Sequence, residues 1–121
     1  MEIDVQSRVP IYEQIVNHLR QQILYGELKP AEKLPSIRLL AKQLQVNPNT
    51  IKKSYQILEK QQLVKSNSTK GTFVTTELEH LLEERIKESF EAITLETKEL
   101  KKMGVSLKRV VEGIEKKWKV L

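Results

Sequence analysis

The sequence of 121 residues contains no cysteine and only two histidines, His18 and His80. The absence of cysteine excludes disulfides, thiolate zinc sites and cysteine nucleophiles. Neither histidine has an imidazole partner at ligand spacing, so we expect no metal site and no cofactor. The chain also lacks a set of nucleophile, base and orienting residue, and we therefore expect no catalytic residues and no enzymatic activity.

Long apolar runs are lacking as well. The longest stretch without a charged residue, Gln43–Ile51, has nine residues, whereas a membrane-spanning helix needs about 20 apolar residues. The N-terminus carries acidic residues before any apolar run, unlike an export signal. We expect a protein with no membrane segment that stays in the cytoplasm.

Acidic residues are scarce in one part of the chain. Residues 33–75 contain eight Lys or Arg and one acid, Glu59, whereas residues 76–121 contain ten residues of each sign. A local excess of positive charge indicates a polyanionic partner such as nucleic acid. A solvated basic face that only keeps the protein soluble is the alternative, and charge alone does not separate the two.

The first half of the chain has the pattern of three helices. Apolar residues recur at every fourth position over residues 11–23, and Pro10 and Gly26 are placed to begin and end that helix. Ser36 is placed to cap a short second helix. Asn47 and Pro48 are typical of a cap and a first position, so a third helix starts about three residues after the second one ends. Such close spacing indicates a helix-turn-helix.

Two short runs after the third helix, Leu63–Ser66 and Thr72–Thr75, flank a polar turn that contains glycine. This pattern predicts a β-hairpin. On the third helix itself, Ile51 and Tyr55 lie on an apolar side, and the opposite side is polar and cationic. We expect Tyr12 and Tyr55 to belong to the core. The predicted fold class is mainly α with a small β-hairpin, a winged helix-turn-helix over residues 1–75.

Residues 76–121 are predicted to form a helical hairpin. Thr76 is placed to cap the first helix and Gly104 to end it, and Ser106 is placed to cap a second helix that runs to the C-terminus. Two such helices cannot enclose a core, so we expect this segment to be a dimerisation arm covered by a second copy of the chain. The expected interface residues are Leu82, Ile86, Phe90, Ile93, Val111, Ile114 and Trp118. An alternative for Trp118 is the wall of a ligand pocket.

Four ordered segments, Val9–Ile15, Leu34–Ala41, Val46–Ile51 and Lys70–Val74, resemble successive signatures of the GntR family of bacterial transcription regulators. The short helical tail and the Asn-Pro-Asn-Thr turn are similar to the YtrA subfamily. The resemblance implies a nucleoid-associated homodimeric repressor that binds a palindromic operator of its own operon or of an ABC transporter operon. A small-molecule effector is a further partner that the sequence neither identifies nor requires.

The chain departs from the family pattern at two places. The family usually has glycine before the valine of the turn, where this chain has Gln45, and its wing tip is usually Gly-x-Gly, where this chain has Ser68–Gly71.

Base reading requires side chains that reach the major groove from the start of the third helix, where Asn suits adenine, Lys suits guanine and a Thr methyl suits thymine. The resemblance implies operator contacts for Arg38 and Lys52. For Asn47 the alternative is a cap that is already occupied, and for Gly71 it is a plain turn requirement. The cations expected to neutralise phosphates are Lys33, Arg38, Lys42, Lys52, Lys53, Lys65 and Lys70. The full set of expected DNA-binding residues is Arg38, Asn47, Asn49, Thr50, Lys52, Lys53, Lys70 and Gly71.

A sequence-specific DNA-binding regulator is therefore the predicted function, with an operator duplex and a second copy of the chain as partners. The alternative is a winged-helix module that binds an acidic protein. Sequence discrimination among duplexes separates the two functions, because both would depend strongly on salt.

Overall fold

The computed structural model describes all 121 residues and divides into two compact units, Met1–Leu82 and Glu83–Leu121. The first unit contains helices α1 (Ile11–Leu24), α2 (Ile37–Leu44) and α3 (Pro48–Lys60), strands β1 (Val64–Asn67) and β2 (Gly71–Val74), and the start of α4 (Leu78–Lys102). The second unit contains the rest of α4 and α5 (Leu107–Trp118). The mainly helical fold with one hairpin confirms the predicted fold class. No helix combines the length and apolar character needed to span a membrane.

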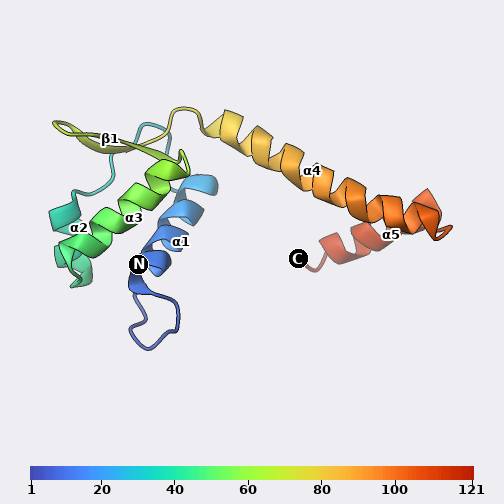
Figure 1. Ribbon diagram of the computed structural model, residues 1–121, viewed down its shortest axis with the longest axis horizontal. Helices are drawn as coiled ribbons and strands as arrows, with labels where there is room; N and C mark the ends of the chain where they lie inside the picture. Colours follow the sequence, from blue (N-terminus) through green and yellow to red (C-terminus); the bar gives the residue numbers. More distant parts are fainter. The chain divides into compact units, whose positions relative to one another are not determined.

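Helix α3 is the centre of the first unit, because α1, α2 and β1 all contact it (Figure 1). Its residues Ile51, Tyr55 and Leu58 are buried, as their spacing predicts. Ser54 is also completely buried, which the apolar pattern does not show. Around α3 the core is completed by buried residues of α1, α2, the hairpin and the start of α4: Ile15, Val16, Leu19, Ile23, Leu34, Leu40, Ala41, Leu63, Val64, Val74 and Leu78.

The predicted caps of three helices are confirmed. The side-chain oxygen of Ser36 accepts the N–H of Leu39, that of Asn47 accepts the N–H of Asn49, and that of Ser106 accepts the N–H of Arg109. These bonds satisfy backbone donors that have no partner inside the helix.

Three predicted boundaries are wrong by a few residues. Pro10 precedes α1 in an extended conformation, and only its carbonyl takes part by accepting N–H groups of the first turn. Helix α4 begins at Leu78 and is not capped by Thr76; the Oγ1 atom of Thr75 accepts the N–H of Glu77 at 3.0 Å in the turn before the helix. Helix α5 ends at Trp118 and does not reach Leu121.

The hairpin is antiparallel, with Val64 opposite Val74 and Asn67 opposite Gly71. Its strands are shifted by one residue from those predicted, because Asn67 both ends β1 and closes the turn by accepting the N–H groups of Thr69 and Lys70. The connector before α2 also joins the sheet through an isolated bridge between Lys33 and Phe73. The hairpin is therefore tied to the segment that leads into α2.

Gln45 ends α2 in the left-handed conformation, with φ of 56°. The N–H of Val46 bonds to Ala41 and that of Gln45 to Lys42, which is the hydrogen-bond pattern of a Schellman motif. The chain therefore adopts the backbone geometry that favours glycine, although it carries glutamine there. Gly104 ends α4 with the same hydrogen-bond pattern and a φ of 81°.

Replacing Gln45 with glycine is expected to raise the free energy of unfolding by about 0.5–1 kcal/mol. Glycine removes the free-energy cost that a residue with a side chain pays in the left-handed conformation. From that gain we subtract the larger conformational entropy that glycine loses on folding. Gln43→Gly is the matched control, because the same exchange at an exposed position in the last turn of α2 is expected to cost up to about 1 kcal/mol. Chemical denaturation measures both. A Gln45→Gly protein less stable than the parent would contradict the argument.

Candidate nucleic-acid interface

The exposed side of α3 carries Asn49, Lys52, Lys53 and Gln56. Burial of Ile51, Tyr55 and Leu58 sets the rotation of the helix, so these four polar side chains are left on its free side. Thr50 is half-buried beside them. The start of α3 thus presents amide, ammonium and methyl groups along one free helix face.

Ser54 fixes α3 against α1. Its hydroxyl lies 2.9 Å from the backbone oxygen of Tyr12 and 3.0 Å from that of Thr50. A completely buried hydroxyl needs such a partner, because an unsatisfied one costs about 1–3 kcal/mol. The first turn of α1 is therefore held beside the first two turns of α3.

Asn47 lies at the N-terminal tip of α3, and its Oδ1 accepts the N–H of Asn49 at 2.8 Å. The side-chain oxygen is therefore used inside the protein, as the capping alternative requires. The bond to Asn49 uses one of the two lone pairs of this oxygen and orients the side chain toward the helix, whereas the side chain of Asn49 keeps its donor and its acceptor free for bidentate pairing with adenine.

Lys53 does not project freely, because its Nζ lies 3.8 Å from the centroid of the Tyr12 ring. This contact is a cation–π interaction between α3 and α1. Tyr12 was expected in the core, but it is half-buried and its ring reaches the exposed face. No local signal could have found this pair, because the two residues are far apart in the sequence.

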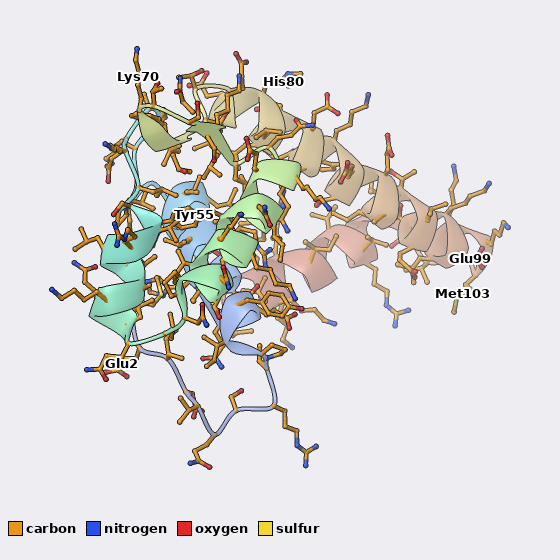
Figure 2. The ribbon with its side chains drawn as sticks, turned by 60° about the vertical axis from the view of Figure 1, so that its left-hand side comes forward. Glu2, Tyr55, Lys70, His80, Glu99 and Met103 are labelled. Carbon is orange, nitrogen blue, oxygen red and sulfur yellow. The ribbon has the colours of Figure 1, made fainter.

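A second group of cations lies between the hairpin and the start of α2, where Lys33, Arg38 and Lys70 line a groove of about 610 Å3. The rest of the lining includes hydroxyl and amide side chains but no acidic residue. These other lining residues are Leu34, Pro35, Ser36, Ile37, Tyr55, Ser66, Asn67, Ser68, Thr69, Gly71 and Thr72. Lys70 extends from the tip of the hairpin (Figure 2). The groove is therefore uniformly positive and suited to an anion.

Gly71 has φ of 110°, a conformation that residues with a side chain rarely adopt. A Cβ atom there would also lie 2.8 Å from Cε of Lys33. The flexible end of the Lys33 side chain could move away from such an atom, so it is the turn conformation that favours glycine at this position, whether or not the backbone approaches a ligand.

Tyr55 lines the groove, and its hydroxyl donates to the carbonyl of Pro35 at 2.7 Å. Burial raises the pKa of Tyr55 from 10.0 to about 12. This bond ties α3 to the residue just before the cap of α2, so it helps to hold Arg38 in place relative to α3.

Because folding raises the pKa of Tyr55, the stability due to its neutral hydroxyl is complete below pH 10 and is lost as the pH rises toward 12. Tyr55→Phe is expected to cost about 1–2 kcal/mol at neutral pH, since the Pro35 carbonyl loses its donor. Denaturation curves at neutral and alkaline pH compare the two proteins. If the variant lost as much stability as the parent above pH 10, ionisation of Tyr55 would not be the cause of the loss.

The arm residues expected at an interface lie in two environments. Leu82 is half-buried and packs against the core of the first unit. The other six, Ile86, Phe90, Ile93, Val111, Ile114 and Trp118, are all exposed. No residue of the second unit is buried, so this unit leaves its apolar side chains uncovered.

The family model for bacterial regulatory proteins of the gntR family matches residues 11–74. An uncharacterized HTH-type transcriptional regulator of Bacillus subtilis, YhcF, is 35% identical over 115 residues, which are 95% of each chain. The HTH-type transcriptional repressor YtrA of the same organism is 33% identical over 119 residues, 95% of this chain and 89% of YtrA.

A solved structure of the DNA-binding domain of AraR in complex with operator ORX1 is also similar. It is 30% identical and has a TM-score of 0.57, over 62% of this chain and 96% of that domain. The similarity to YhcF and YtrA includes the arm, whereas the AraR domain matches a smaller part of the chain.

Proposed function

This chain belongs to the gntR family of bacterial regulatory proteins and is a transcriptional regulator with a DNA-binding domain, and we propose that it is a homodimeric repressor that reads a palindromic operator. The observation that carries the proposal is the free polar face of α3 beside a positively charged groove. An α-helix with its side chains is about 10–12 Å wide and fits the major groove, which is about 12 Å wide.

In this proposal Asn49 is the principal base reader. It lies on the free face in the first turn of α3, with both polar atoms of its amide available. Lys53 supplies a donor for a guanine or a phosphate, and the methyl group of Thr50 can contact a thymine. Lys52 is exposed on the same face and binds the phosphodiester backbone of the DNA. Asn47 serves mainly as the cap.

The groove between the hairpin and α2 holds the phosphodiester backbone in this proposal. Arg38 enters it from α2, Lys70 from the hairpin and Lys33 from the connector. Each cation that neutralises a phosphate releases condensed counterions, so binding weakens as salt rises. Gly71 keeps the hairpin turn in the conformation that places Lys70 there. The operator complex of the similar AraR domain supports assigning this unit to DNA.

The arm supports the dimer. Phe90 and Trp118 are 63% and 74% exposed, and large apolar side chains left uncovered on a helix indicate an interaction surface. A second copy of the same arm supplies a matching apolar face, and the twofold pairing would present two reading helices to two half-sites. YtrA, which is similar over the arm as well, is named a repressor.

We propose the chain's own operon or an ABC transporter operon as the target, as the similarity to the YtrA subfamily implies. An effector is not required by this proposal, because repression needs only occupancy of the operator.

Selection of binding sites from random duplexes with the purified protein tests the function. We expect enrichment of an inverted repeat whose half-sites are about one or two helical turns apart. Enrichment of a single unrepeated site would overturn the twofold mode of binding. No enrichment in low salt would overturn DNA reading altogether and favour an acidic protein as the partner of the basic surface.

A further inference from the structure

Tyr12 makes two contacts with α3 that differ in kind. Its backbone oxygen is 2.9 Å from the buried hydroxyl of Ser54, which fixes the first turn of α1 in place. Its ring lies under the ammonium of Lys53, with Nζ 3.8 Å from the centroid. The first contact fixes the backbone that carries the ring, and the second places a base-reading candidate over that ring.

The ring is the partner of Lys53 in this structure. The salt bridge between Glu99 and Lys102 is the one ion pair present, so no carboxylate lies within 4.0 Å of the ammonium of Lys53. Lys53 follows Asn49 by four residues on α3, so the two side chains are neighbours on the helix surface. Both residues line a shallow groove whose other walls are Ile11, Tyr12 and Thr50.

A lysine side chain normally loses much rotamer freedom when it is ordered. An ammonium already held over a ring loses less of that freedom when DNA binds. The interaction is also weak enough, on the order of a hydrogen bond, to let the ammonium donate outward at the same time. The groove has no acid that would draw Lys53 away from Asn49.

We propose that Tyr12 is a positioning residue for DNA recognition, which holds the ammonium of Lys53 beside Asn49 before the operator binds. The proposal rests on the proposed function. In the complex the ammonium of Lys53 donates a hydrogen bond to an acceptor of the duplex, either guanine O6 and N7 or a phosphate oxygen.

A double-mutant cycle of Tyr12→Leu and Lys53→Met tests this role on the selected operator. We expect Tyr12→Leu to weaken operator binding about two- to fivefold when Lys53 is present and to have no further effect in the Lys53→Met protein. Tyr12→Phe is the conservative control, because it keeps the ring, and we expect affinity close to that of the parent. Equal losses in both Lys53 backgrounds would show a purely structural role and overturn the proposal.

The free protein gives a second measurement. Protons next to Nζ of Lys53 should show an upfield ring-current shift by NMR, retained in Tyr12→Phe and lost in Tyr12→Leu. Absence of that shift in the parent would overturn the proposal even if the variants bind weakly. If Tyr12 and Lys53 are coupled in binding to the operator but not to a random duplex, the acceptor that Lys53 contacts is a guanine. If the coupling is equal on both duplexes, the acceptor is a phosphate.

The proposed function and the positioning role of Tyr12 are tested separately by these experiments. A parent protein that prefers no duplex removes the proposed function and this role with it. A parent that discriminates well but shows no coupling between Tyr12 and Lys53 removes only the positioning role.

Discussion

Asn49→Ala is expected to weaken binding to the preferred operator by about 1–3 kcal/mol, roughly 5- to 150-fold, and to leave binding to random duplexes unchanged. Asn49 lies on the free face of α3 and uses only its backbone N–H in the cap of Asn47. Its amide can therefore form two hydrogen bonds with one adenine edge, and alanine forms neither. Alanine also favours helix, so the variant is expected to fold.

Arg38→Ala is the matched control for this measurement. Arg38 lines the groove beside the hairpin and is expected to contact phosphate. Its loss should weaken operator and random DNA alike and lower the salt slope by about one contact. Titrations at several salt concentrations distinguish the two variants. An Asn49→Ala protein that keeps the affinity of the parent for the operator would remove Asn49 from base reading.

Phe90→Glu is expected to convert the proposed dimer to a monomer and to lower operator affinity by about 10²- to 10⁴-fold, the range of avidity that linked binding sites provide. In a twofold interface each substitution occurs twice, so two carboxylates would enter one apolar contact. Ile86, Phe90 and Ile93 fall on one side of α4 at helical spacing, and all three are exposed. Light scattering across a range of concentrations reports the mass.

Leu95→Glu is the matched control, because Leu95 is also an exposed apolar residue of α4 but lies on the opposite side from Ile86. It should leave both the mass and the affinity unchanged. Trp118→Ala tests α5 in the same way, with a smaller fall in the dimer fraction. A Phe90→Glu protein that keeps the mass of the parent dimer would contradict an interface on this side of α4, and an unchanged mass for Trp118→Ala would exclude Trp118 from the interface.

The sequence by itself determined where the helices lie to within a few residues, the caps of α2, α3 and α5, and the polar face of α3. Ser36, Asn47 and Ser106 act on backbone donors two or three residues away, and the burial of Ile51, Tyr55 and Leu58 follows from a period of 3.6 residues. Such signals are local, so they can be read without knowing what the helix packs against. Glycine at residue 104 marks the end of α4 for the same reason.

Only the tertiary structure decided which partners these elements meet. The bridge from Lys33 to Phe73, the placement of Tyr12 under Lys53 and the buried hydroxyl of Ser54 each join residues about 40 positions apart. The left-handed Gln45 depends on packing that outweighs the preference of its own residue type. Hydrogen bonds and contacts between distant segments depend on how the whole core closes, which no short sequence window contains.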